Sequence, residues 1–339
     1  MANPLLNVEN LTVKIILDTS VLTVVEDLSF QLFQGKTLGI VGESGSGKTM
    51  TALSLMKIFP NYPTFQLNGK IIYNNQNLVD LKEKEMRKIR GSRIGMIFQN
   101  PSTALNPVYT IGNQLMEVAE LHLNLFGEQA EAKAIQALQE VGISAAKERL
   151  NDYPHQLSGG MKQRVMIAMA LMCEPDILIA DEPTTALDVT IQAQVLQLMK
   201  DLQKKKNMAI LLITHDIGVI AEMADDVIVM YAAKDMEKGK VADIFNNTAH
   251  PYTKGLFDSK PKIGQETIVP IKGNIPSPSH FPDGCHFHPR CPFCMEKCKR
   301  GEIANFFLSD DHYARCVLYD QSIESSEKLK QRTIKTIPH

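Results

Sequence analysis

Residues 42–49 have the sequence Gly42-Glu43-Ser44-Gly45-Ser46-Gly47-Lys48-Thr49, which matches the pattern G-x-x-x-x-G-K-[ST] completely. The short apolar run 37–41 before them is typical of a buried strand, and a helical pattern begins at Lys48. Glycines allow such a loop to curl so that its N–H groups face phosphate oxygens, and the following helix adds its positive end. Lys48 would reach the terminal phosphates, and the Thr49 hydroxyl would bind Mg²⁺. The stretch therefore predicts a nucleotide-binding loop between a strand and a helix.

The pattern around this loop alternates between strands and helices. β-Branched residues concentrate before the loop, and strands are expected at 11–17, 21–33, 94–98, 177–180, 209–214 and 226–230. Helices are expected at 74–89, 118–125, 128–141, 165–173, 191–204 and 217–224. This order predicts an α/β protein with a mostly parallel sheet covered on both faces, an N-terminal β region and a helical insertion at 100–165.

The composition limits the partners that the chain can have. Its 339 residues carry a net charge of −2 and no tryptophan, so neither a basic field nor base stacking favours nucleic acid. No apolar run approaches the roughly 18–20 residues that span a bilayer, and the first residues lack the pattern of a signal peptide. We therefore expect a cytosolic protein that reaches a membrane only through a partner.

Two adjacent carboxylates, those of Asp181 and Glu182, end the apolar strand expected at 177–180. Asp181 is expected to hold Mg²⁺ through water, and Glu182 to polarise the water molecule that attacks the terminal phosphate. A pair of capping residues at a strand end is the alternative. The phosphate loop upstream favours the catalytic interpretation.

A second anion site is predicted in the signature segment, residues 157–164, with the sequence Leu-Ser-Gly-Gly-Met-Lys-Gln-Arg. Ser158, Gly159 and Gly160 lie at the start of the helix expected at 161–172, where N–H donors and the helix dipole favour a phosphate. Since the glycine loop already occupies one side of a nucleotide, this site would bind the γ-phosphate of a nucleotide on another subunit. A simple N-cap role for Ser158 is the alternative.

In this order the motifs resemble the ATP-binding subunits of ABC transporters, over residues 5–245. The resemblance implies a P-loop NTPase (RecA-like) core that binds ATP and Mg²⁺ and hydrolyses ATP, with Lys48 and Glu182 among the catalytic residues. It adds Gln99 as a sensor and ligand of Mg²⁺ that also senses the attacking water, and His215 as a contact of the γ-phosphate. Asp188, in Ala186-Leu187-Asp188, would lie at the interface between two ATPase subunits.

One position departs from that family. Its members usually carry an aromatic side chain that stacks on adenine, near the loop before the third N-terminal strand. The matching position here is Leu22. Apolar contact would replace stacking, so we expect weaker selectivity for adenine.

Five of the six cysteines lie between residues 285 and 316, in a proline-rich part that excludes long helices and central strands. This part, with the stretch 250–256, resembles the C-terminal extension of ATPases from oligopeptide, dipeptide and nickel importers. The resemblance implies a [4Fe–4S] cluster on four cysteines: Cys285, Cys291, Cys298 and Cys316. Zn²⁺ on the same thiolates, with His286 or His288, and unligated thiols are the alternatives. Cys294, an extra thiol, leaves the ligand set open.

Both resemblances imply a peripheral subunit on the cytoplasmic face of the cell membrane that powers the uptake of di- or oligopeptides. Its partners would be a second ATPase subunit (a paralogue, or a second copy), two membrane-spanning permease subunits and an extracytoplasmic peptide-binding protein. A nickel or other small-solute importer is the alternative, followed by a soluble ABC ATPase that acts on nucleic acid. We expect an ATP-binding domain at 1–245, a cysteine-containing extension at 246–321 and a flexible tail at 322–339.

Overall fold

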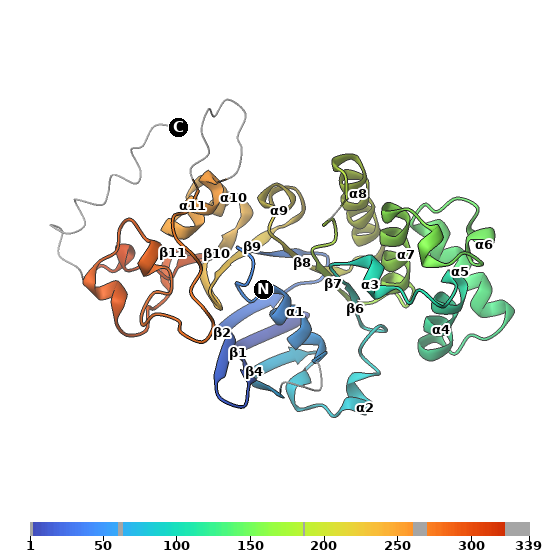
Figure 1. The fold of residues 1–339 in the computed structure, drawn as a ribbon, viewed down its shortest axis with the longest axis horizontal. Helices are drawn as coiled ribbons and strands as arrows, with labels where there is room; N and C mark the ends of the chain where they lie inside the picture. Colours follow the sequence, from blue (N-terminus) through green and yellow to red (C-terminus); the bar gives the residue numbers. More distant parts are fainter. Residues whose placement is uncertain (1–2, 60–63, 186, 260–269, 323–339) are drawn as a thin grey trace.

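The computed structural model describes residues 3–59, 64–185, 187–259 and 270–322 (Figure 1). Outside these ranges lie Ala186, residues 260–269 of the expected extension and residues 323–339 of the expected tail. Within the described ranges, no helix has the length and apolar character needed to cross a bilayer.

An eight-stranded sheet, in the order β11-β12-β10-β9-β3-β8-β7-β6, forms the centre of the molecule. Its strands from β9 to β6 run parallel, as the alternating pattern predicted. Their bounds are β3 (Thr37–Val41), β6 (Ile94–Ile97), β7 (Ile177–Asp181), β8 (Ala209–Thr214) and β9 (Asp226–Tyr231). Every residue of β3, β7 and β8 is buried, which explains their almost continuous apolar sequence.

Alternate residues of these strands enter two separate cores, one on each face of the sheet. Leu178 and Ala180 pack with α7 (Gly159–Leu171), α8 (Val189–Lys206) and α9 (Ile217–Met223). Ile177 and Ile179 pack with α1 (Lys48–Met56) and the N-terminal strands. The sheet is therefore covered on both faces, and its carboxyl edge stays open for the glycine loop, which follows the central strand β3.

A second, antiparallel sheet has the order β2-β1-β4-β5. It consists of β1 (Leu6–Ile16), β2 (Val21–Leu32), β4 (Thr64–Tyr73) and β5 (Gln76–Asn77). The helix expected at 74–89 was wrong. Asn74 and Asn75 have φ values of 48° and 62° and form the turn between β4 and β5. Only a 3₁₀ turn (Leu78–Asp80) and the short α2 (Glu83–Met86) follow.

The helical insertion lies at one end of the molecule, to the right in Figure 1. It contains α3 (Pro101–Ala104), α4 (Ile111–Leu123), α5 (Glu128–Glu140), α6 (Ala146–Arg149) and a 3₁₀ turn (Pro154–Gln156), and leads into α7. Ile111, Leu115 and Ala119 recur at a spacing of four residues and are fully buried, so α4 packs along a single apolar stripe.

The C-terminal part extends the central sheet at the opposite end of the molecule. β12 pairs antiparallel with β10, and β11 completes the edge. The elements are β10 (Lys234–Lys240), α10 (Val241–Asn246), α11 (Pro251–Asp258), β11 (Phe306–Ser309) and β12 (His312–Ala314), with 3₁₀ turns at His288–Arg290, Glu296–Lys299 and Val317–Tyr319. None of the strands β10, β11 and β12 was expected from the sequence.

A buried network of charged groups joins this part to β10. The carboxylate of Glu237 accepts hydrogen bonds from the backbone N–H groups of Ala249 (2.8 Å) and His250 (2.9 Å). Arg315 forms an ion pair with Asp235, with 3.0 Å between Nε and Oδ1. Since buried charges are tolerated only with such partners, the network fixes the C-terminal part on the sheet.

Candidate functional site

The glycine loop lies at the carboxyl end of β3 in a conformation that depends on its glycines. Gly47 has a φ of +102°, and a Cβ atom there would lie 2.4 Å from the carbonyl oxygen of Val24. A Cβ atom on Gly42 would lie 2.1 Å from the carbonyl oxygen of Met230. Side chains at either position would therefore displace backbone atoms of neighbouring strands. Gly42, Glu43, Ser44, Gly45, Ser46, Gly47, Lys48 and Thr49 together form the curled segment that the pattern predicted.

Lys48 is buried inside this curl. Its ammonium donates hydrogen bonds to the carbonyl oxygens of Gly42 (2.8 Å) and Glu43 (2.9 Å). Burial lowers the pKa of Lys48 below its usual value, and the nearby carboxylates of Glu182 and Asp181 oppose this shift. The cation is thus held where a phosphate group at the loop would meet it.

Asp181 and Thr49 place two oxygen atoms close together beside Lys48. The Thr49 Oγ1 and Asp181 Oδ1 atoms are 3.3 Å apart, and Asp181 is only 2% exposed. Burial raises the pKa of Asp181 from 3.8 to about 6. A buried carboxylate next to a hydroxyl is a suitable environment for Mg²⁺, which prefers oxygen ligands and would stabilise the ionised form.

We predict that Asp181→Asn stabilises the nucleotide-free protein. The pKa of Asp181 in the folded chain, about 6, lies above its ordinary value of 3.8, so the native protein loses stability as the pH rises through this window. Asparagine does not ionise and should add up to about 3 kcal/mol of unfolding free energy at neutral pH. Urea unfolding of both proteins at several pH values measures this, and an equal pH dependence would contradict it. The variant should also lose Mg²⁺-dependent turnover.

The Glu182 carboxylate is held by side chains from three separate segments. Gln99 Nε2 donates to Oε2 (3.0 Å), Thr185 Oγ1 donates to Oε2 (2.8 Å), and His215 Nδ1 lies 3.0 Å from Oε1. Gln99 follows β6, Glu182 follows β7 and His215 follows β8. The parallel sheet therefore gathers at one edge the residues that the sequence analysis selected from distant positions. Thr185 was missed, although it follows Glu182 by three residues.

The electrostatics of Glu182 keep its carboxylate ionised. Burial alone would raise the pKa of Glu182, but hydrogen bonds from His215 and Thr185 outweigh burial and lower it. The backbone at Glu182 has a φ of 48°, and its N–H donates to the carbonyl oxygen of Ile213 at 2.8 Å. The carboxylate is thus ionised at neutral pH and rigidly oriented.

The signature segment begins α7, as expected, and its Gln163 donates to the carbonyl oxygen of Pro183 (2.6 Å), the residue after Glu182. Ser158 Oγ accepts a hydrogen bond from the Met161 N–H (3.3 Å), so it caps the helix. Ser158 and Gly159 are exposed, and Gly160 packs against Ile191 of α8. Asp188 is exposed and caps α8 in the same way, with 3.0 Å to the Ile191 N–H. Among the hydrogen bonds and ion pairs of the described residues, none joins this surface to the glycine loop.

Four cysteines of the C-terminal part line a common pocket, together with His250 and His288. They are those of the predicted ligand set: Cys285, Cys291, Cys298 and Cys316. Burial raises the pKa of all four thiols, for Cys285 to about 11 and for Cys291 to about 12. Cys294 does not line this pocket. Within the described ranges, no three His, Cys, Asp or Glu side chains are close enough together to hold a metal ion.

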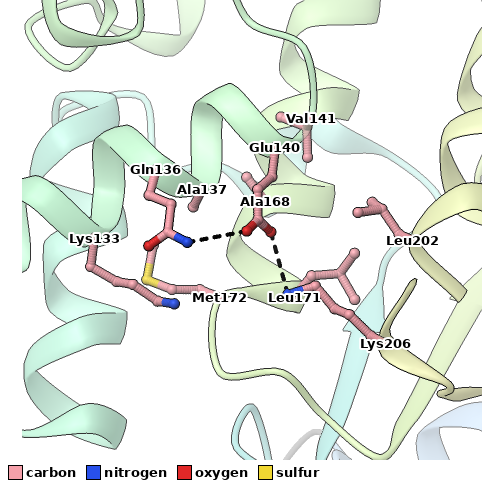
Figure 2. A pocket seen from close by; sticks show the side chains of 10 residues that line it. All are labelled: Lys133, Gln136, Ala137, Glu140, Val141, Ala168, Leu171, Met172, Leu202 and Lys206. Carbon is pink, nitrogen blue, oxygen red and sulfur yellow. Dashed lines mark hydrogen bonds and ion pairs between the residues drawn. The ribbon is translucent and has the colours of Figure 1, made fainter.

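A further pocket lies where the helical insertion meets the core, between α5, α7 and α8 (Figure 2). Glu140 Oε2 lies 3.3 Å from Lys206 Nζ, and Glu140 Oε1 accepts a hydrogen bond from Gln136 at 3.2 Å. None of the residues expected to bind or hydrolyse the nucleotide lines this pocket. The pocket is therefore a structural junction between α5 and α8.

Two family models match this chain. Residues 25–185 match the model of the ABC transporter, and residues 236–298 match that of the oligopeptide/dipeptide transporter, C-terminal region. The dipeptide transport ATP-binding protein DppD of Bacillus subtilis is 49% identical over 94% of this chain and 96% of its own length. The oligopeptide transport ATP-binding protein OppD of Haemophilus influenzae is 47% identical over 92% of this chain and 99% of its own length.

A solved structure shows the same core. It is a dimeric ATP-binding cassette in a post-hydrolysis state bound to ADP and phosphate, with a TM-score of 0.61 and 28% identity, covering 70% of this chain and 98% of its own. The P-loop NTPase core that the family resemblance implied is thereby confirmed. From the site, the sheet and these likenesses it follows that this chain belongs to the family of ATP-binding subunits of oligopeptide/dipeptide ABC transporters.

Proposed function

We propose that this chain is one of two ATPase subunits that together power the uptake of di- or oligopeptides. ABC subunits of this kind are ATPases coupled to transport, and relatives named for dipeptide and oligopeptide transport match it over nearly its whole length. The observation that carries the chemistry is the Glu182 carboxylate, held between Gln99, Thr185 and His215 beside the glycine loop.

Each residue of the site has a distinct role in this proposal. The loop N–H groups and Lys48 hold the β- and γ-phosphates, and Glu182 orients a water molecule in line with the γ-phosphorus and accepts its proton. Gln99 and His215 keep the Glu182 carboxylate in place and contact the water and the γ-phosphate. Thr49, Asp181 and Gln99 would hold Mg²⁺, which would supply positive charge to the phosphates.

The signature segment supports a site shared between two chains. Ser158 and Gly159 are exposed at the start of α7, with Gly160 beside them, and Asp188 is exposed at the start of α8; among the described residues, no hydrogen bond joins these four to the glycine loop. A helix end binds anions through its N–H groups and dipole, so it suits the γ-phosphate of a nucleotide on a sister subunit. We infer that the sister is a paralogous ATPase, and that both dock on two permease subunits at the cytoplasmic face of the membrane, supplied by an extracytoplasmic peptide-binding protein.

Uptake by membrane vesicles tests the proposed substrate. The chain would be co-produced with the permeases and the second ATPase of its own source, and ATP-dependent accumulation of a labelled dipeptide, a labelled tetrapeptide and nickel would be compared. Accumulation of either peptide supports the proposal. Accumulation of nickel alone, or co-purification with nucleic acid in place of permeases, would contradict it.

We propose that residues 246–321 hold a [4Fe–4S] cluster and that residues 1–245 form the ATP-binding domain, with the helical subdomain at 100–165. Support for the cluster comes from the four thiols that line one pocket, because soft thiolates are the usual ligands of iron–sulfur clusters. Such a cluster would contribute structure to the pocket, since it would join four cysteines that lie far apart in the sequence. Zn²⁺ binds the same ligand type and is the competing outcome.

The cluster is tested by its colour and metal content. Protein purified without oxygen should be brown and hold about four iron and four sulfide per chain, and Cys291→Ser should abolish the colour. Cys294→Ser is the matched control inside the module and Cys173→Ser the control outside it, and both should retain the colour. A colourless protein with about one zinc per chain would reject the cluster.

A further inference from the structure

The side chain of Arg290 joins the C-terminal part to the glycine loop. Arg290, in the 3₁₀ turn His288–Arg290, donates from Nη1 to Glu43 Oε2 (2.7 Å) and from Nη2 to Glu43 Oε1 (3.2 Å). Glu43 is the second residue of the glycine loop. The exposed fractions are 5% for the Arg290 side chain and 26% for that of Glu43. The two-pronged geometry and the burial make this a strong charge-assisted contact.

Arg290 is itself fixed from several directions. Its Nε donates to the carbonyl oxygen of Lys272 (3.0 Å), and Nη2 also reaches the carbonyl oxygen of Ile271 (3.3 Å). The guanidinium lies 5.6 Å from the ring centroid of Tyr231 and 5.9 Å from that of Phe287. Since its position is determined by the C-terminal part and β9, Arg290 acts as a rigid support for Glu43.

A second contact holds the backbone of the same residue. The Glu43 N–H donates to the Tyr252 hydroxyl at 2.9 Å. Tyr252 is buried and packs against Tyr231 and Phe287, with ring centroids 4.6 and 5.3 Å away. The carbonyl oxygen of Glu43 in turn accepts from Lys48. Glu43 therefore connects the C-terminal part directly to the lysine of the phosphate loop.

The charge of Glu43 explains why such a partner is needed. An anion in the second position of the loop lies next to the space where the ATP phosphates bind, and like charges at short range in a partly buried site repel strongly. The Arg290 guanidinium offsets this charge and directs the carboxylate towards the C-terminal part.

We propose that Arg290 is a positioning residue for ATP binding: it neutralises Glu43 and fixes the start of the phosphate loop, so that the affinity for ATP depends on the cysteine-containing part. The inference rests on the proposed role of residues 42–49 in binding ATP. It assigns to the extension a function in the nucleotide site itself.

The main test replaces Arg290 with glutamine, which removes the charge and keeps a donor for the Ile271 and Lys272 carbonyl groups. We expect the Kd for MgATP, measured on the full chain, and the KM of ATPase turnover to rise roughly tenfold, as for loss of one charge-assisted contact. The kcat should change far less, because Gln99, Glu182 and His215 are untouched. Arg290→Lys keeps the charge and should restore most of the affinity.

A double variant separates neutralisation from simple destabilisation. If Arg290 acts by neutralising Glu43, then adding Glu43→Gln to Arg290→Gln removes the unbalanced anion and recovers much of the lost affinity. If Arg290 only stabilised the fold, the second substitution would weaken the protein further. Recovery supports the proposal, and additive losses overturn it. Should Arg290→Gln fail to fold, Glu43→Gln alone decides: the proposal requires tighter ATP binding than in the unaltered chain.

Two controls complete the experiment. Lys240→Gln breaks another ion pair between β10 and the C-terminal part, with Asp311 (2.9 Å), and should leave ATP affinity unchanged. Lys48→Ala should abolish ATP binding. If Lys48→Ala binds ATP normally, the proposed site is wrong; if it fails to bind while Arg290→Gln binds normally, only the present inference is wrong.

Discussion

Glu182→Gln is expected to bind ATP as tightly as the unaltered protein and to lose turnover by roughly 10²–10⁴-fold, the usual contribution of a general base. Glutamine retains the shape of the side chain and an oxygen for the Thr185 hydroxyl, which lies 2.8 Å from Oε2. It cannot accept the proton of the attacking water. Nucleotide binding and pairing with a second ATPase subunit should therefore persist, with ATP trapped between the chains.

Single-turnover ATP hydrolysis and light scattering of the ATP-bound protein measure these two effects. Glu222→Gln is a matched control, because Glu222 is half exposed on α9 and forms an ion pair with Lys200 (2.9 Å), which is not a residue of the site. It should hydrolyse ATP at the normal rate. Normal hydrolysis by Glu182→Gln would remove Glu182 from the catalytic role.

Gly160→Asp should abolish turnover while the isolated chain still binds ATP with normal affinity. The new carboxylate would lie in the first turn of α7, beside Ile191 of α8, where it would repel the γ-phosphate presented by a second chain. A Cβ atom at this position would also approach Ile191 Cγ2 to 2.9 Å. Since helix N–H donors to a reacting phosphate act like those of an oxyanion site, we expect a loss of roughly 10²-fold or more.

Equilibrium binding of a fluorescent ATP analogue and steady-state hydrolysis separate the two quantities. Thr110→Asp provides the control, because it adds the same charge at the N-cap of α4, where aspartate caps a helix at least as well as threonine. Turnover should be normal in that variant. If Gly160→Asp lost ATP affinity in the isolated chain, the signature segment would belong to the site of its own chain.

The sequence was sufficient to predict those residues of the site that come directly after a buried strand. Gln99, Glu182 and His215 each come after a buried apolar strand, and parallel strands place their carboxyl ends along one edge. Their proximity was therefore predictable, although their roles stay predictions until the variants are measured. The hydrogen bond from Thr185 was missed because its only signal is a position three residues after Glu182.

The C-terminal part was less predictable for a physical reason. β12 is three residues long and consists of His312, Tyr313 and Ala314, so it has too few positions to show a period. Its pairing depends on buried partners in β10, such as Glu237 and Asp235, whose sequence is polar and does not resemble a strand. The contact between Arg290 and Glu43 has no local signature, since nothing near Arg290 in the chain indicates which carboxylate it meets. Here tertiary contacts, not local propensity, determine the structure.

The ion pair between Glu43 and Arg290 also sets an order of events during synthesis. The two residues are 247 positions apart. At about 5–20 residues per second, a ribosome needs roughly 10–50 s to add Arg290 after Glu43. During that time the Glu43 carboxylate of the nascent phosphate loop lacks the Arg290 guanidinium that balances its charge, while ATP is already present in the cell. A newly made chain would thus acquire its full affinity for ATP only when its last elements fold. A chain truncated before Arg290 would bind ATP weakly and would compete poorly with complete chains for pairing with the second ATPase subunit.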